Sequence, residues 1–219
     1  MMMNNRKYDA VLFDMDGTIL DTVPLIVESF QHTFMKHLGH YEDEQKIIAG
    51  IGLPLETVFA DYSQTDRDAM MKTYVEHNVE LLPTHIGLFI GMPALFEKLK
   101  QAGIKLGIVT SKRLSSAMGS IEPFGLEHYF DLIQAKEATT KHKPDPEPLL
   151  HAMSELDVSD PKRVVYVGDS LFDMLCARNA GCYAAMVDWT RMDKNQIKVW
   201  KPDFWIDDLD EFYNWVVNQ

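Results

Sequence analysis

A short apolar run that ends in two carboxylates constrains the fold of this 219-residue chain more than any other feature. Val11–Phe13 has the bulky residues of a strand buried on both faces, and Asp14 and Asp16 follow it closely. In parallel α/β sheets, ligands bind just beyond the carboxyl ends of the strands. Gly17 lets the chain turn tightly and leaves room for a substrate. This pattern predicts either a hard-cation site or a nucleophile with an acid–base partner. The competing interpretation is a buried strand followed by a solvated acidic turn.

Composition and charge exclude several classes of function. The formal net charge of −12 repels a phosphate backbone, so we expect no nucleic-acid partner. No apolar run approaches the length of a membrane span, and the polar segment 1–7 lacks the apolar core of a signal peptide. Two cysteines are too few for a disulfide framework and fit a reducing compartment. We therefore expect a cytoplasmic protein with no membrane partner, and the sequence leaves open whether it is a monomer or a homodimer.

Hydrophobic spacing divides the chain into two kinds of segment. From about residue 20 to residue 86, apolar residues recur at helical intervals and no segment is rich in strand signals. One stripe here, which indicates packing rather than a cofactor site, consists of Met70, Met71, Tyr74, Val75 and Val79. After Gly87, predicted strands alternate with helices; one of these helices should turn Leu149, Leu150, Met153 and Leu156 inward. This alternation predicts an α/β protein whose parallel sheet is covered on both faces.

Further polar residues stand where other predicted strands and loops end. In chain order they are Thr110, Ser111 and Lys112 after segment 106–109, Lys143 in a loop stiffened by prolines, and Asp169 and Asp173 after segment 164–167. Parallel strands joined by helical crossovers point the same way, so we expect these residues to converge at one edge of the sheet.

The converging residues suit the parts of a phosphoryl-transfer site. Oxygen-only ligands favour Mg²⁺, and the candidate ligands are Asp14, Asp16, Asp169 and Asp173, the last in a supporting position. Asp14 is the candidate nucleophile and Asp16 the candidate acid–base group. Thr110 or Ser111 can donate a hydrogen bond to a phosphoryl oxygen, and Lys143 can offset the negative charge that gathers there. Lys112 is either solvated or adds positive potential at the mouth of the site.

This combination of motifs resembles the haloacid dehalogenase-like hydrolase superfamily along nearly the whole chain. The motifs stand as Asp14–Thr18, Thr110 or Ser111, Lys143–Pro146 and Gly168–Asp173. The resemblance implies a Rossmann-like core, residues 1–19 and 87–219, with an all-helical cap, residues 20–86, inserted in it. It also implies a magnesium-dependent phosphatase that forms an aspartyl-phosphate on Asp14, with phosphate bound by Gly17, Thr110, Ser111 and Lys112. In this family an aspartate at the position of Asp16 marks phosphatases and phosphotransferases.

Within this family the chain looks most like phosphoglycolate phosphatases and PpaX-type bacterial pyrophosphatases, and two cap segments look especially like the pyrophosphatases. These segments are Glu28–Thr33 and Thr73–Asn78. A small phosphorylated metabolite, similar to phosphoglycolate, or inorganic pyrophosphate is therefore the expected substrate. Such caps meet the substrate at a loop that corresponds to Gly50, Ile51, Gly52, Leu53 and Pro54, which carries no lysine or arginine to hold a second charged group.

Three other functions compete with a phosphatase. β-Phosphoglucomutase-like phosphotransferases carry a cap histidine that corresponds roughly to Ile26, and an isoleucine cannot transfer a proton. A signalling receiver domain also holds a phosphoaspartate on an α/β sheet, but on a later strand and without a helical insertion after the first. A member of the superfamily that has lost catalysis would serve as a binding protein, yet Asp14, Asp16, Lys143 and Asp169 are all present.

Overall fold

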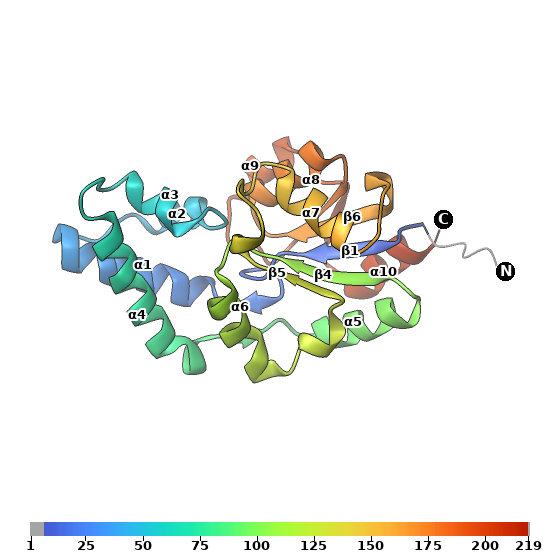
Figure 1. Ribbon diagram of the computed structural model, residues 1–219, viewed down its shortest axis with the longest axis horizontal. Coiled ribbons are helices and arrows are strands. Elements are labelled where there is room, and N and C mark those ends of the chain that lie inside the picture. Colours follow the sequence, from blue (N-terminus) through green and yellow to red (C-terminus); the bar gives the residue numbers. More distant parts are fainter. Residues whose placement is uncertain (1–6, 219) are drawn as a thin grey trace.

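The computed structural model describes residues 7–218 and contains a parallel six-stranded sheet between two layers of helices (Figure 1). The strand order is β5-β4-β1-β6-β7-β8. The strands are β1 (Ala10–Phe13), β4 (Lys105–Val109), β5 (Leu132–Gln134), β6 (Val164–Gly168), β7 (Tyr183–Val187) and β8 (Phe204–Ile206). This architecture confirms the predicted α/β fold class. Residues 1–6, most of the polar N-terminal segment considered above, lie outside the described range.

Helices cover both faces of this sheet because its strands are apolar on both sides. Alternate residues of β1 belong to different clusters: Val11 and Phe13 to one, Ala10 and Leu12 to the other. The first cluster packs under α5 (Met92–Gln101), α6 (Leu114–Ile121) and α10 (Leu209–Val217). The second packs under α7 (Glu147–Glu155), α8 (Leu171–Ala180) and α9 (Lys194–Val199). Short 3₁₀ turns are η1 (Glu122–Phe124), η2 (Glu127–Tyr129), η3 (Lys136–Ala138) and η4 (Pro161–Arg163).

The register of the central strands brings their carboxyl ends level with one another. Phe13, the last residue of β1, pairs with Ile108 of β4 and with Val167 of β6. Asp14 therefore begins its loop beside the ends of both neighbouring strands, and its amide donates a hydrogen bond to the Val167 carbonyl oxygen at 2.8 Å. This is the convergence at one sheet edge that the strand pattern predicts.

A separate group of helices, left of the sheet in Figure 1, has its own hydrophobic cluster. They are α1 (Val23–Leu38), α2 (Glu44–Gly50), α3 (Leu55–Ala60) and α4 (Arg67–His85). We call these four helices the cap. Phe30, Phe34, Phe59 and Tyr74 form its aromatic centre. The chain enters and leaves the cap through two short antiparallel strands, β2 (Leu20–Asp21) and β3 (Gly87–Leu88).

Two local expectations from the sequence are wrong. Leu20 and Asp21 were expected in an all-helical segment, but they form β2, and Leu20 is buried in the cluster of the main sheet. Leu150 was expected to point inward from α7, but it is 45% exposed, because α7 buries the face that carries Leu149 and Met153. Within the described residues, no helix is both long and apolar enough to cross a membrane.

Candidate active site

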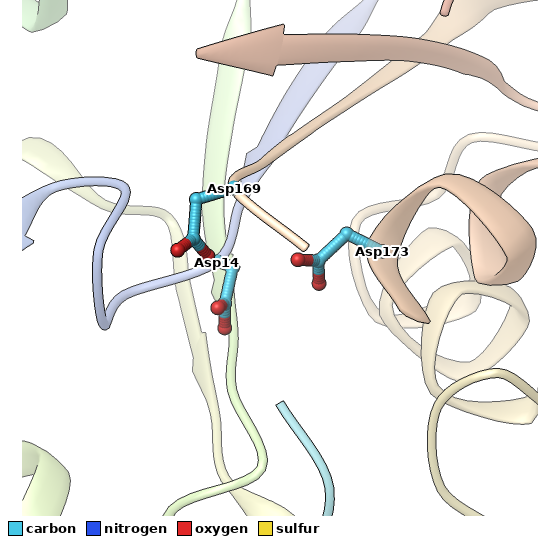
Figure 2. A group of neighbouring side chains, drawn as sticks. All are labelled: Asp14, Asp169 and Asp173. Atoms are coloured by element: carbon cyan, nitrogen blue, oxygen red, sulfur yellow. The ribbon is translucent and has the colours of Figure 1, made fainter. Parts of the chain in front are cut away.

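Three aspartates from three different places in the chain meet at the carboxyl edge of the sheet. Asp14 follows β1, Asp169 follows β6, and Asp173 lies in the first turn of α8; Figure 2 shows their carboxylates gathered together. Carboxylate oxygens of the three residues all lie within 4.8 Å of one another. All three side chains are buried, with Asp173 completely inaccessible. Negative charge this concentrated needs nearby positive charge, which identifies the next residue.

Lys143 supplies that charge from the loop before α7. Its Nζ lies 2.9 Å from Asp14 Oδ1 and 2.8 Å from Asp173 Oδ1, and it donates a hydrogen bond to the Tyr166 hydroxyl at 3.1 Å. The residue is only 3% exposed. Burial works against a charged ammonium, but the carboxylates of Asp14 and Asp173 outweigh it and raise the pKa of Lys143 well above its usual range. Lys143 is therefore a fixed cation inside the site.

One ammonium does not neutralise the whole cluster. Burial, reinforced by Asp173 and Asp16, raises the pKa of Asp14 from 3.8 to about 7, although Lys143 acts in the opposite direction. Burial and the neighbouring Asp173 and Asp14 also raise the pKa of Asp169 well above its usual range. Without another cation, Asp14 and Asp169 therefore keep their protons at pH values at which an isolated aspartate is ionised.

The donor set fits a magnesium ion. Oδ1 of Asp169 is buried and has no hydrogen-bond partner among the described residues, so one oxygen ligand is unused. Gly17, at a φ of +72°, lies so close that an added Cβ would be 2.2 Å from Asp169 Oδ2. Glycine therefore both permits this turn and leaves the space that the carboxylate occupies. Oxygen-only donors with concentrated negative charge are what Mg²⁺ prefers.

Asp173 has a structural role as well as a place in this cluster. Ser170 caps α8, and its amide donates a hydrogen bond to Asp173 Oδ2 at 3.0 Å, so the pair forms a capping box. Oδ1 of the same carboxylate accepts from Lys143. Because these contacts occupy both oxygens, Asp173 is suited to orienting Lys143 and the start of α8 beside the metal site. This matches the supporting position that the sequence predicts for it.

Asp16 has a different set of partners. Its Oδ1 accepts a hydrogen bond from the Thr22 hydroxyl at 2.6 Å and lies 2.7 Å from Lys112 Nζ. Its carboxylate is not part of the group formed by Asp14, Asp169 and Asp173. The sequence left open whether Lys112 is solvated or adds positive charge to the site. Its side chain is only 16% exposed, which agrees with positive charge at the site.

The two neighbouring hydroxyl groups after β4 differ in their contacts. The Ser111 hydroxyl donates to the Gly52 carbonyl oxygen of the cap at 2.7 Å. The Thr110 hydroxyl oxygen accepts from the Lys112 amide at 3.2 Å, which leaves its hydrogen available to another acceptor. Thr110 and Ser111 both border the cavity that also contains Asp14, Asp16 and Lys143.

That cavity has a volume of about 680 Å³ and lies between the cap and the core. Of the predicted cap loop, Gly50, Ile51, Gly52 and Leu53 line it, whereas Pro54 is the N-cap residue of α3 and is absent from the lining. Met71, Val75 and Val79 of α4 also line it. The interpretation as packing residues is wrong for the exposed Val75 and Val79, whereas Met71 both lines the cavity and packs against the cap's hydrophobic cluster. Met70 and Tyr74, from the same stripe, do belong to the cap's hydrophobic cluster.

Several residues beside the cavity were not predicted from the sequence. Glu56 of α3 lies 3.1 Å from Arg113 Nη2 and 2.5 Å from Lys136 Nζ, and thereby joins cap to core. Partial burial opposes its ionisation, but hydrogen bonds from Lys136 and Arg113 lower the pKa of Glu56 to about 2. The three residues are distant in sequence and follow no motif. Tyr166 was assigned only to a buried strand, although its aromatic hydroxyl was a signal that it needed buried polar partners.

Comparison with known proteins agrees with this geometry. A family model described as haloacid dehalogenase-like hydrolase matches residues 11–187. The chain belongs to the haloacid dehalogenase-like hydrolases. A protein of Caldanaerobacter subterraneus subsp. tengcongensis, named as a candidate pyrophosphatase PpaX, is 38% identical over 203 residues, which are 93% of this chain and 92% of the relative. Pyrophosphatase PpaX of Oceanobacillus iheyensis is 33% identical over 200 residues, 91% and 92% of the two chains.

A solved structure of the same family confirms the likeness in three dimensions. The haloacid dehalogenase-like family protein of Streptococcus pneumoniae superposes with a TM-score of 0.82 at 26% identity, covering 95% of this chain and 98% of that one. Family and relatives together confirm the prediction of a hydrolase of the phosphatase type, and the receiver-domain alternative loses its support.

Proposed function

We propose that this haloacid dehalogenase-like phosphatase is magnesium-dependent and hydrolyses a small phosphorylated metabolite or inorganic pyrophosphate through an aspartyl-phosphate on Asp14. The single observation that carries the proposal is the cluster of Asp14, Asp169 and Asp173, in which Lys143 pairs with Asp14 and Asp173. Asp14 and Lys143 also line the cavity. PpaX, the name of the relatives above, is that of a pyrophosphatase, which supports pyrophosphate as one candidate.

The first chemical step joins the phosphorus of the substrate to an oxygen of Asp14 while the bond to the leaving oxygen breaks. Asp16 lines the same cavity as Asp14 but is held by Thr22 and Lys112, so we assign it the proton that the leaving oxygen receives. In the second step, Asp16 takes a proton from water as the water attacks the phosphorus, and the Asp14–phosphorus bond breaks to release phosphate. Lys112 and Thr22 hold the Asp16 carboxylate in position through both steps.

Mg²⁺, held by Asp14, Asp169 and the supporting Asp173, would supply positive charge for the phosphoryl oxygens. Lys143 balances Asp14 and Asp173, so the nucleophile stays fixed in orientation while the negative charge of a phosphate enters beside it. Gly17 allows the backbone to approach closely at this point, because no side chain stands between it and Asp169.

The contacts of the two hydroxyl groups assign them different roles. Thr110 keeps a free hydroxyl hydrogen within the cavity, so we assign it the hydrogen bond to a phosphoryl oxygen. Ser111 already donates to the Gly52 carbonyl of the cap, so we assign it to holding the loop closed over the substrate. Ile26 lines the cavity without a titratable group, which supports hydrolysis rather than a mutase-like transfer.

Replacing Asp14 tests the proposed nucleophile. The isosteric variant Asp14→Asn keeps the shape of the site, but an amide cannot form the acyl-phosphate. We expect phosphate release from every accepted substrate to fall by at least about 10³-fold. The assay is release of inorganic phosphate from a panel of phosphorylated metabolites and pyrophosphate. Asp61→Asn, an equivalent change at an exposed residue after α3, is the matched control. Full activity in the Asp14 variant would exclude the proposed mechanism.

A further inference from the structure

Most of the cap residues that line the cavity are apolar, although Glu56, Asp68, Lys72 and Asn78 line it too. This apolar wall comes from three parts of the cap and includes Ile26, Phe30, Ile51, Leu53, Met71 and Val75. At about 680 Å³, the cavity falls in the range of about 300–1,000 Å³ that is typical of sites for drug-sized ligands. Pyrophosphate and phosphoglycolate are far smaller than such ligands and have no apolar portion to place against this wall.

Helix α4 carries apolar residues that pack in the cap and others that border the cavity, and Met71 and Tyr74 do both. Met70 and Tyr74 are buried against α1 and α3 in the cap cluster. Along α4, a second row of apolar residues at steps of four lines the cavity: Met71, Val75 and Val79. The side chain of Val75 is 39% exposed and that of Val79 is 57% exposed. An exposed apolar stripe inside a concave site is a feature of apolar ligand contact.

The cations around the cavity are already paired. In the part of the chain that the structure describes, each lysine or arginine lining the cavity has a carboxylate partner: Lys143 with Asp14 and Asp173, Lys112 with Asp16, Lys136 and Arg113 with Glu56, and Lys72 with Glu76 at 3.8 Å. A second anionic group on the substrate would compete with Asp16 or Glu56 for these cations, and separating those partly buried pairs is unfavourable. The Lys72–Glu76 pair is well exposed and contributes little.

We infer that the substrate is a phosphate monoester whose leaving group is an uncharged alcohol with a mainly apolar carbon skeleton. The phosphoryl group would lie beside Asp14 and the carbon skeleton against Ile26, Ile51 and the Met71–Val79 stripe. This inference rests on the proposed function and narrows its substrate class. It predicts that pyrophosphate and phosphorylated carboxylic acids are poor substrates of this chain.

A matched series of alkyl phosphates tests the inference. Methyl, hexyl and 5-carboxypentyl phosphate have alcohol leaving groups of similar reactivity and differ in apolar length or terminal charge. We expect kcat/KM for hexyl phosphate to exceed each of the other two, and pyrophosphate and phosphoglycolate, by at least about tenfold, since contacts of a few methylene groups give differences of this size. If pyrophosphate or phosphoglycolate is hydrolysed as efficiently as hexyl phosphate, the inference is overturned while the phosphatase function stands.

A charge placed on the exposed stripe supplies the second test. Val75→Lys adds an unpaired ammonium to the cavity wall at a position that is already partly exposed, so folding should be preserved. We expect the preference for hexyl over 5-carboxypentyl phosphate to fall by at least about tenfold. Val199→Lys, at an exposed valine of α9 outside the cavity lining, is the control and should leave the preference unchanged. An unchanged preference in the Val75 variant would count against the inference.

Binding of phosphonates separates this inference from the proposed function. Methylphosphonate, hexylphosphonate and phosphonoacetate contain no hydrolysable P–O–C bond, so calorimetric titration of the intact protein with Mg²⁺ measures affinity without turnover. The inference requires hexylphosphonate to bind tightest of the three. If no phosphate ester or anhydride is hydrolysed, the proposed function fails, and the order of phosphonate affinities still supports or refutes the apolar site.

Discussion

Lys143 shows how far the surroundings of a residue decide what it does. Lysine is almost never fully buried unless it is paired, so an isolated lysine in a loop is most simply interpreted as a surface residue. Here the loop before α7 places it beside two carboxylates and a tyrosine hydroxyl, and it becomes 3% exposed. The motif could be predicted from the sequence, whereas the hydrogen bond to Tyr166 could not, because nothing local links residues 143 and 166.

The variant Lys143→Met tests that environment. It removes the cation that lowers the pKa of Asp14, which burial has already raised to about 7. Asp14 would then release its proton only at higher pH, and we expect the acidic limb of the profile of kcat/KM against pH to move upward. The maximal kcat should fall by about 10²–10³-fold, as on removal of other groups that stabilise developing charge.

Lys141→Met is the matched control for this prediction. Lys141 lies two residues away, its side chain is 68% exposed, and it forms an ion pair with Asp145 at 3.4 Å. The control should keep both the rate and the pH profile, since exposed ion pairs contribute little. A Lys143 variant with the same profile as this control would show that the ammonium does not act on Asp14.

The strand ends are the elements that make the site. In each case an apolar run is followed at once by a carboxylate or a hydroxyl. Asp14, Thr110 and Asp169 could be predicted from this pattern, because each strand and its polar side chain are neighbours in the sequence. The faces of α4 were not predictable in this way. A stripe such as Met71–Val79 has the same spacing whether it meets another helix or an open cavity, so periodicity alone could not distinguish packing from substrate contact.

Magnesium should stabilise the folded protein in a pH-dependent way. Burial raises the pKa of Asp14 from 3.8 to about 7, so in the metal-free protein its contribution to stability is full below 3.8 and is lost as pH rises through 7. Metal binding needs deprotonated carboxylates, so it opposes this loss most strongly at high pH. We expect Mg²⁺ to raise the melting temperature by several degrees at pH 8 and much less at pH 5; a hundredfold excess over the dissociation constant corresponds to about 2.7 kcal/mol.

Thermal unfolding with and without Mg²⁺, at constant ionic strength, measures this effect. Asp169→Asn removes one carboxylate with the unpartnered Oδ1 and should abolish most of the stabilisation at pH 8. Equal stabilisation at both pH values, or an undiminished effect in the variant, would contradict a metal site at these aspartates.

At the scale of the whole molecule, cap and core meet through few specific contacts around the cavity. Glu56 bridges to Lys136 and Arg113, and Gly52 accepts a hydrogen bond from Ser111. The side chains of Glu56 and Lys136 are 29% and 17% exposed, so this pair is partly buried, whereas Arg113 is 60% exposed. We expect this bridge to hold the cap closed and to break when the cap opens.

Glu56→Gln should therefore loosen cap closure more than it destabilises the fold. The pKa of Glu56, about 2, keeps it charged throughout the neutral range, and the amide ends both ion pairs. We expect kcat/KM to fall severalfold, the melting temperature to change little, and amide hydrogen exchange in segment 50–56 to accelerate. Glu97→Gln, an exposed glutamate of α5 that contacts only Gln101, serves as the control. Unchanged exchange in the Glu56 variant would show that the bridge does not hold the cap.

The paired strands at the base of the cap bear on how such an enzyme can diversify. Asp21 and Gly87 are partners in the two-stranded ladder, so the points of entry and exit are separated only by the spacing of neighbouring strands, about 5 Å. A tight turn can span that gap. The segment between them can therefore change in length and sequence without interrupting any strand of the catalytic sheet, and Thr22, which holds Asp16, is a position that such changes would have to keep.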